Sequence, residues 1–264
     1  MIVHNAGTSA MDSRWFRRYH RPADGRTDRT RLICFPHAGG AAGGYAGLAR
    51  RLAPHLDVYA VQYPGRHDRR HETPESRLTA LAERVAQRLL ESTPGPYAFF
   101  GHSMGALVAY ETARVLQKHG APAPLRLILS GRGAPTQRPD PNDRLDDDAA
   151  ILAAARRLGG TDAAVLDDPE LVELALPVLR ADYAALAAYR WTAEPVLSTP
   201  LSVFVGADDP LVPQEAARSW ADRTRQEAET LLFPGGHFYL GEQLDKVAEA
   251  IVDRVPSRPV GPRT

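Results

Sequence analysis

Gly101-His102-Ser103-Met104-Gly105 decides the fold of this chain because of the residues on either side of it. The apolar run Tyr97-Ala98-Phe99-Phe100 predicts a buried strand, and the stretch from Ala106 to Gln117 predicts a helix. A serine between two glycines at such a strand-to-helix turn is typical of a nucleophile elbow, whose strained backbone lifts the hydroxyl above the sheet edge. We therefore predict that Ser103 is a nucleophile. The alternative, a turn serine with accidental glycines, fits this context less well.

A nucleophilic serine of this kind should be followed along the chain by an acid and then by a histidine, each after a strand. The run Pro200–Gly206 predicts a strand, and it ends in Ala207-Asp208-Asp209-Pro210. A second apolar run, Glu229–Phe233, ends in Pro234-Gly235-Gly236-His237. An imidazole can take the serine proton, and a carboxylate on its far nitrogen holds the productive tautomer. The order therefore predicts His237 as the base.

Two neighbouring aspartates compete for the acid position. Side chains of successive residues in an extended segment point in opposite directions, so only one of Asp208 and Asp209 can face the histidine. We expect Asp209 to face the histidine, an assignment that follows from the family resemblance described below, and Asp208 to cap the turn. His102 adjoins the serine, but the elbow turns adjacent side chains apart, which makes it a poor base for that hydroxyl.

Backbone N–H groups are expected to stabilise the negative oxygen that forms during attack. Met104 follows the nucleophile and begins its helix, where the helix dipole favours negative charge. The second donor should come from the loop after an early strand, Leu32–Phe35, and we assign it to Ala38 in Pro36-His37-Ala38-Gly39-Gly40. A phosphate-binding loop is the alternative for these glycines, but the sequence lacks G-x-x-x-x-G-K-[ST].

Charge and cysteine content exclude several classes of function. The 32 Lys and Arg balance the 32 Asp and Glu, so nothing global attracts nucleic acid or an anionic membrane. No long apolar span or signal-peptide pattern is present, and we expect a cytoplasmic protein. Cys34 is the only cysteine and lies in an apolar run, which predicts a buried thiol. No Cys/His cluster has ligand spacing, so we expect no metal and no cofactor.

Predicted strands and helices alternate along the chain, which indicates an α/β fold with a mostly parallel sheet covered on both faces. Apolar stripes at helical spacing predict helices over 76–91 and from Leu244 to Val255. The strands are predicted at 31–35, 57–62, 97–101, 125–130, 200–206 and 229–233.

The segment at about 136–199 interrupts this alternation, because it contains only helical patterns. Acidic residues 146–148 begin one helix, and Gly159 suits its C-terminal cap. A second helix, from Glu170 to Trp191, contains Pro177, which predicts a kink or a break into two helices. An insertion between nucleophile and acid is well placed to cover the site, and we interpret it as a lid over an apolar acyl channel; a static insert is the alternative.

The ends of the chain divide it into three parts. We expect an arginine-rich extension over 1–29, partly disordered, in which Trp15, Phe16 and Tyr19 pack locally. One catalytic domain is expected over 30–255. A proline-rich disordered tail should follow over 256–264. Residues 1–10 have no evident structural logic, and whether they are native stays open.

Several stretches together resemble the type II thioesterases, which are free-standing α/β-hydrolases of polyketide synthase and nonribosomal peptide synthetase pathways. The resemblance covers roughly residues 30 to 253. The stretches are L-I-C-F-P-H-A-G-G (32–40), Q-Y-P-G-R (62–66), G-H-S-M-G (101–105), R-A-D-Y (180–183), G-A-D-D-P (206–210) and P-G-G-H-F-Y-L (234–240).

The resemblance implies an α/β-hydrolase fold with a helical lid, and hydrolysis of stalled or aberrant acyl groups from the phosphopantetheine arm of acyl or peptidyl carrier proteins. It implies that Ser103, Asp209 and His237 form a triad, with Ala38 and Met104 as the oxyanion hole. It further implies carrier-protein partners, and we expect a monomer. Because carrier proteins are typically acidic, Arg66, Arg69 and Arg70 or the N-terminal arginines are candidates for docking; a solvated basic loop is the alternative.

Three other functions stay open on the sequence. A generic small-molecule esterase or peptidase of the same fold would prefer oxygen esters or amides. A ligand-sensing relative would bind and barely turn over. A terminal thioesterase domain excised from a synthase would release or cyclise a finished product.

Overall fold

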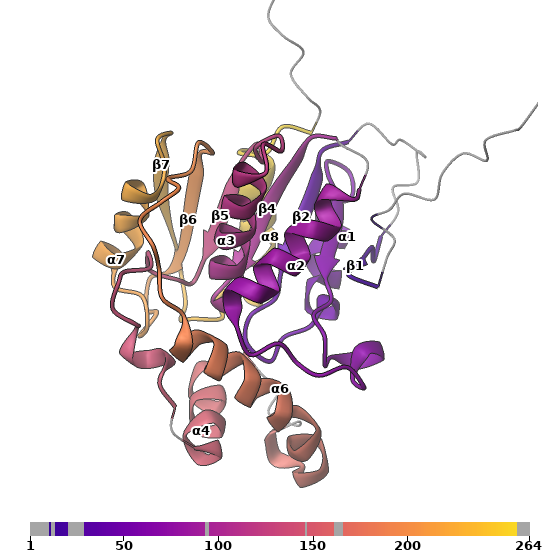
Figure 1. Cartoon of the computed structure of the whole chain (residues 1–264), viewed down its shortest axis with the longest axis vertical. Helices are drawn as coiled ribbons and strands as arrows, with labels where there is room; N and C mark the ends of the chain where they lie inside the picture. Colours follow the sequence, from indigo (N-terminus) through magenta and orange to yellow (C-terminus); the bar gives the residue numbers. More distant parts are fainter. Residues whose placement is uncertain are drawn as a thin grey trace, which may run out of the picture.

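A mostly parallel sheet forms the centre of the molecule (Figure 1). The computed structural model describes residues 11, 14–20, 29–92, 95–145, 147–160 and 166–257. Within them seven strands lie in the order β1-β3-β2-β4-β5-β6-β7, and only the β1–β3 pair is antiparallel. The strands are β1 (Phe16–Arg17), β2 (Arg31–Phe35), β3 (Asp57–Val61), β4 (Tyr97–His102), β5 (Leu127–Ser130), β6 (Leu201–Gly206) and β7 (Ala228–Phe233).

The inner strands form where the sequence has apolar runs, because a parallel sheet is covered on both faces. Every residue of β3, β5 and β6 is buried. All six strands predicted from the sequence are confirmed, with ends that differ by at most two residues. Cys34 of β2 is a buried free thiol, as predicted, and burial raises its pKa.

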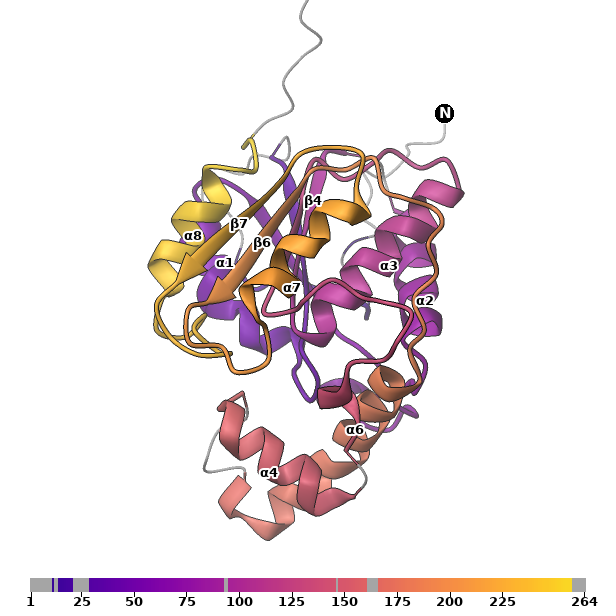
Figure 2. The same cartoon turned by 90° about the vertical axis from the view of Figure 1, so that its left-hand side faces the viewer.

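Helices cover the two faces of the sheet separately (Figure 2). One face packs on α2, α3, α7 and Trp220, and the other packs on α1 and α8. The predicted amphipathic helices are confirmed: 76–91 corresponds to α2, and 244–255 corresponds to α8. These helices are α1 (Ala46–Leu52), α2 (Leu78–Leu90), α3 (Met104–Lys118), α7 (Gln214–Arg218) and α8 (Leu244–Val252), joined by the short 3-10 helices η2 (Ala42–Tyr45), η3 (His67–Arg69) and η5 (Ser219–Arg223).

The segment between β5 and β6 is helical, as predicted, and its helices lie beyond one end of the sheet in both views. It contains η4 (Pro141–Asp143), α4 (Asp148–Leu158) and α6 (Pro169–Ala188). The Asp147 carboxylate caps α4 by accepting from the Ala150 N–H at 2.8 Å, and Gly159 ends it with φ +80°. Of the two outcomes predicted at Pro177, a kink or a break, the break does not occur, since α6 is one helix through that residue.

Both ends of the described chain are tied to the sheet. Phe16 begins the edge strand β1 and is buried, so this part of the expected extension belongs to the fold. Thr30 donates its N–H to the Ser257 carbonyl at 3.1 Å and its hydroxyl to the Pro256 carbonyl at 2.6 Å. These two hydrogen bonds join the residue before β2 to the last described residues of the chain. Our expectations for residues 1–10, 12–13, 21–28, 146 and 258–264 lie outside the described residues.

Candidate active site

Ser103 lies in the tight turn between β4 and α3. Its backbone has φ 54° and ψ −117°, a left-handed conformation that side chains rarely adopt. A Cβ on Gly101 would lie 2.2 Å from the Gly105 carbonyl oxygen, and one on Gly105 would lie 2.0 Å from the Phe35 carbonyl oxygen. A side chain at either glycine would therefore collide with neighbouring backbone. Close packing of strand and helix forces this turn and aims the hydroxyl at the cavities beside it.

His237 and Asp209 reach Ser103 from two loops at the same edge of the sheet. His237 Nε2 lies 3.1 Å from Ser103 Oγ, and His237 Nδ1 lies 2.8 Å from Asp209 Oδ2. The loops pack closely, because a Cβ on Gly206 would lie 2.2 Å from the Gly236 carbonyl oxygen. His237 and the Asp209 carboxylate are buried. The three side chains singled out from the sequence therefore form one hydrogen-bonded chain.

Asp209 also caps its own turn, a task that the sequence analysis gave to Asp208. Asp209 Oδ1 accepts from the Leu211 N–H at 2.9 Å, which leaves Oδ2 for the histidine. Asp208 is exposed, and its N–H donates to the Gly235 carbonyl. One carboxylate can do both tasks because its two oxygens face different donors. The expectation of a capping Asp208 is therefore wrong.

The two candidate oxyanion donors lie on either side of Ser103. Met104 is the first residue of α3, so its N–H has no partner within the helix. Ala38 lines both small cavities next to Ser103. Among the residues that the structure describes, the Ala38 N–H meets no protein acceptor. Ala38 and Met104 follow the neighbouring strands β2 and β4. The strand after β2 in the chain lies on one side of this pair, and the strand after β4 lies on the other side. Ligands commonly bind at such a switch point of an α/β sheet.

Two further histidines lie near His237 and pack on the Phe238 ring: His102 is fully buried, and His37 is half-buried. The His102 ring lies 5.1 Å from the His237 ring and packs on Phe238, and its Nδ1 is 2.9 Å from Ser130 Oγ. Burial lowers the pKa of His102 well below its usual value and that of His37 to about 4. Both rings are therefore neutral near pH 7. Ser103 Oγ is paired with His237 rather than with the adjacent His102, as the elbow geometry predicts.

The helical insertion forms one wall of the cavities at Ser103. Cavities of about 40 and 30 Å³ meet at Ser103, and the first adjoins a wider one of about 470 Å³ that begins at Arg132 and Gly133. Both small cavities are bounded by side chains of α4 and α6. These side chains include Ala154, Ala155, Leu158, Leu179, Tyr183 and Leu186.

The sequence matches the family model of the thioesterase domain over residues 30–255. This chain belongs to the thioesterase domain family. It is 44% identical over 242 residues to a probable cadicidin biosynthesis thioesterase of Streptomyces griseus, covering 91% of this chain and 66% of that protein. It is 40% identical over 245 residues to the thioesterase PikA5 of Streptomyces venezuelae, covering 91% and 85%. The type II thioesterase BorB of the borrelidin cluster has a similar structure, with TM-score 0.83, 40% identity, and 92% and 98% of the chains covered.

The basic residues that we considered for docking in this thioesterase are largely unavailable. Arg66 and Arg69 are 4% and 2% exposed, and Arg69 packs over the Trp15 ring while pairing with Glu72. Only Arg70 of the three is exposed. Three of the N-terminal arginines that the structure describes pair with acids as well: Arg14 with Glu72, Arg17 with Asp68 and Arg18 with Asp57. The loop of Arg66, Arg69 and Arg70 is thus neither a free basic surface nor simply solvated.

We assigned no role to Asp182 from the sequence, although it lies in the R-A-D-Y stretch. This buried carboxylate reaches the loop that carries Ala38, as described below. Its only sequence signal is an acid on an apolar helical face, because Val178, Leu179, Ala185 and Leu186 are the other buried residues of α6.

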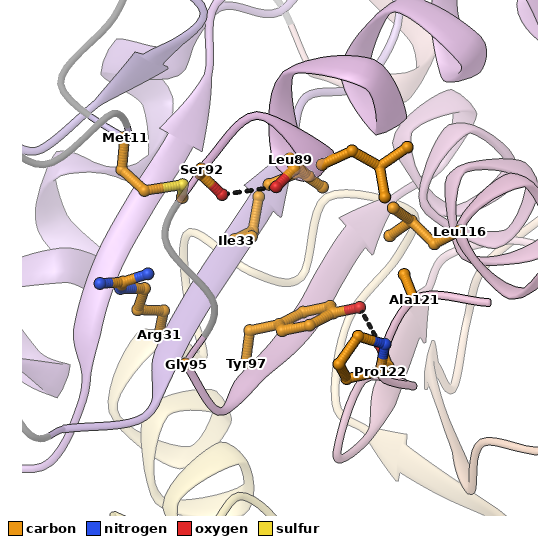
Figure 3. Close-up of a pocket in the computed structure, with 11 residues that line it drawn as sticks. Met11, Arg31, Ile33, Leu89, Ser92, Gly95, Tyr97, Leu116, Ala121 and Pro122 are labelled. Carbon is orange, nitrogen blue, oxygen red and sulfur yellow. Dashed lines mark hydrogen bonds between the residues drawn. The ribbon is translucent and has the colours of Figure 1, made fainter. Parts of the chain in front are cut away.

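An apolar cavity of about 200 Å³ lies apart from this site, at the amino-terminal ends of β2 and β4 (Figure 3). Arg31 and Tyr97, which begin these strands, line it together with Leu89 and Leu116. The Tyr97 hydroxyl donates to the Pro122 carbonyl across its rim (Figure 3). Because Ser103 follows the opposite end of β4, this cavity is separate from the candidate active site.

No group of His, Cys, Asp and Glu side chains suited to a metal ion occurs within the described residues. Among the helices of the described chain, none is long and apolar enough to cross a membrane.

Proposed function

We propose that this thioesterase hydrolyses acyl thioesters carried on the phosphopantetheine arm of acyl or peptidyl carrier proteins, by way of an acyl-enzyme on Ser103. The proposal rests on the hydrogen-bonded chain Ser103–His237–Asp209 in a member of the thioesterase family. Among its relatives, the protein of Streptomyces griseus is a probable cadicidin biosynthesis thioesterase, and BorB is a type II thioesterase of the borrelidin biosynthetic cluster. An editing role, which clears stalled or aberrant acyl groups, is the function we assign.

The chemistry follows from which atoms face each other. His237 Nε2 takes the proton as Ser103 Oγ attacks the thioester carbonyl carbon. Asp209 Oδ2 accepts from the protonated ring at Nδ1 and stabilises its charge. The N–H groups of Ala38 and Met104 hold the oxyanion. The thiol leaves with the proton from His237, and water activated by the same ring releases the acid.

We assign the catalytic domain to residues 30–255 and treat the insertion at about 136–199 as its lid. The support is that side chains of α4 and α6 bound both cavities at Ser103. The wider cavity beyond Arg132 suits a long, thin arm that reaches the serine from the surface. We propose that the enzyme needs no cofactor, because its own side chains supply the nucleophile and the base, and its own backbone N–H groups supply the anion donors. A monomer in the cytoplasm fits this role.

Release of short acyl groups from a phosphopantetheinylated carrier protein tests the function, beside acyl-CoA and p-nitrophenyl esters. We expect faster release from the carrier than from either small substrate. In Ser103→Ala, kcat should fall by about 10⁵-fold or more, with an unchanged melting temperature. Fast ester cleavage with an untouched acyl-carrier would instead support a generic esterase, and normal turnover by Ser103→Ala would disprove the mechanism.

A further inference from the structure

A carboxylate from the insertion reaches into the loop that carries the candidate oxyanion donor. Asp182, on α6, is 1% exposed. Its Oδ2 accepts from the Gly39 N–H at 2.7 Å and from Arg66 Nη2 at 2.5 Å. Burial raises the pKa of Asp182, and the charge of Arg66 and the Gly39 N–H oppose that rise. Two donors on one oxygen show that this carboxylate is used to bind the loop.

Arg66 completes the bridge from the other side of the same loop. Its Nε donates to the Gly40 carbonyl at 2.8 Å, and its Nη1 donates to the Pro64 carbonyl at 2.9 Å. The guanidinium lies 4.9 Å from the centre of the Tyr63 ring. The planar fork of arginine suits this task because it can hold several acceptors in fixed directions. Arg66 therefore joins the loop, the Tyr63–Arg66 turn and α6.

The position of the Gly39 N–H matters because Ala38 and Gly39 are the central residues of a tight turn. The Gly40 N–H donates to the His37 carbonyl at 3.0 Å, and Gly39 has φ +74°. Asp182 holds the N–H of the peptide between Ala38 and Gly39, whose orientation distinguishes turn types, and the Ala38 N–H belongs to the peptide directly before it in the same turn. A Cβ on Gly39 would lie 2.6 Å from Leu179 Cδ2, so α6 also packs directly on this turn.

We propose that Asp182 and Arg66 are positioning residues, which aim the Ala38 N–H at the oxyanion and make the oxyanion hole complete only while α6 is seated on the loop. The inference rests on the proposed function through the role of Ala38. Stability alone explains the pair poorly, because a buried ion pair is often no better than apolar side chains of similar size. A displaced α6 would leave the Gly39 N–H without its acceptor and free the turn to reorient.

Asp182→Asn is the informative substitution, with Asp148→Asn as its matched control. The asparagine keeps the shape of the side chain but loses the charge that holds Arg66 and Gly39 together. Asp148 pairs with Arg180 between α4 and α6, in an exposed ion pair. The control therefore makes the same change in the same insertion without touching the loop. Steady-state kinetics would use p-nitrophenyl acetate and an acyl-carrier thioester, with circular dichroism to verify folding.

We expect kcat of Asp182→Asn to fall by about 10- to 100-fold on both substrates, with KM within about threefold, because a misplaced donor weakens transition-state binding. Asp148→Asn should match the unsubstituted enzyme. An Asp182→Asn enzyme with unchanged kcat, or with only KM raised, would overturn the inference.

A second variant separates positioning from folding. Arg66→Met combined with Asp182→Leu replaces the ion pair by apolar side chains, which should restore the melting temperature toward that of the unsubstituted enzyme. We expect kcat to stay low, because the Gly39 N–H still lacks its acceptor; recovery of kcat together with stability would overturn the inference. The ester separates this inference from the proposed function. If the unsubstituted enzyme cleaves the ester but not the carrier thioester, the proposed substrate is refuted. The effect of Asp182→Asn can still be measured on the ester.

Discussion

The helices α3 and α6 contribute to the same site but are anchored differently. α3 follows the nucleophile and is buried along nearly its whole length, between the sheet and α2. α6 is longer, at 20 residues, yet its buried residues all lie after Pro177. The half before it exposes Leu171 and Leu174, at 39% and 72%. The serine is thus fixed by the core, whereas the wall opposite it is anchored only through one half of a helix.

Two glycine substitutions should give the largest contrast between these regions. In Gly105→Ala the new Cβ meets the Phe35 carbonyl oxygen at 2.0 Å, so we expect a loss of at least about 4 kcal/mol in the free energy of unfolding. Gly159 ends α4, and a Cβ there would meet open space. Gly159→Ala should therefore lower the free energy of unfolding by only about 1 to 2 kcal/mol, because of the φ of +80°. Urea unfolding measures both. Similar losses would mean that the elbow is less tightly packed than the structure indicates.

The two halves of α6 can be compared by the same truncation. Leu186 is 3% exposed and belongs to the main core cluster, so Leu186→Ala should destabilise the protein by about 2 to 5 kcal/mol. Leu174→Ala removes a side chain that is 72% exposed and should change stability by less than about 0.5 kcal/mol. Thermal unfolding of both variants decides. A large loss at Leu174 would show that the first half of α6 is buried against something in solution.

Lowering the pH should lower the free energy of unfolding, because two histidines near the site are neutral in the folded protein. Burial lowers the pKa of His37 to about 4 and that of His102 well below its usual value, whereas an unfolded histidine titrates near 6.5. Below pH of about 6.5 the unfolded chain therefore binds more protons than the folded one, and stability falls as the pH drops. Each histidine contributes about 1.4 kcal/mol per pH unit, to order of magnitude.

Urea unfolding at pH 7, 6 and 5 measures this slope. His102→Gln should reduce it by about half, because one of the two histidines no longer titrates. Stability that stays flat between pH 7 and 5 would contradict the burial of these rings.

The difference between the two regions also explains what the sequence could predict. Strands such as β6 are apolar runs buried on both faces, so local pattern alone reveals them. The elbow, the acid and the histidine follow strand ends in a fixed order, and parallel strands bring those ends together. The two-residue β1 has no pattern long enough to detect, and its pairing with β3 depends on tertiary contact.

Charged residues were the main source of error, for a physical reason. Arginine is usually exposed, which suggested a docking surface for Arg66 and Arg69. Their burial depends on partners that no local pattern reveals: Asp182 lies 116 positions from Arg66, and the Trp15 ring packs on Arg69. In the same way, a proline predicts a kink or a break in α6, and the break does not occur because the second half of the helix packs on the core.

The smallest predicted effect concerns the wall that α4 adds to the site. Leu158 lines both small cavities at Ser103, so Leu158→Ala should admit a longer acyl group than the unsubstituted enzyme does. We expect the ratio of kcat/KM for hexanoyl over acetyl thioesters to rise by about tenfold, since each methylene in an apolar pocket changes binding modestly. Leu152→Ala, on the same helix but lining neither cavity, is the control and should leave the ratio unchanged. An unchanged ratio in Leu158→Ala would mean that the acyl group does not contact α4. The insertion would then contact only the phosphopantetheine arm.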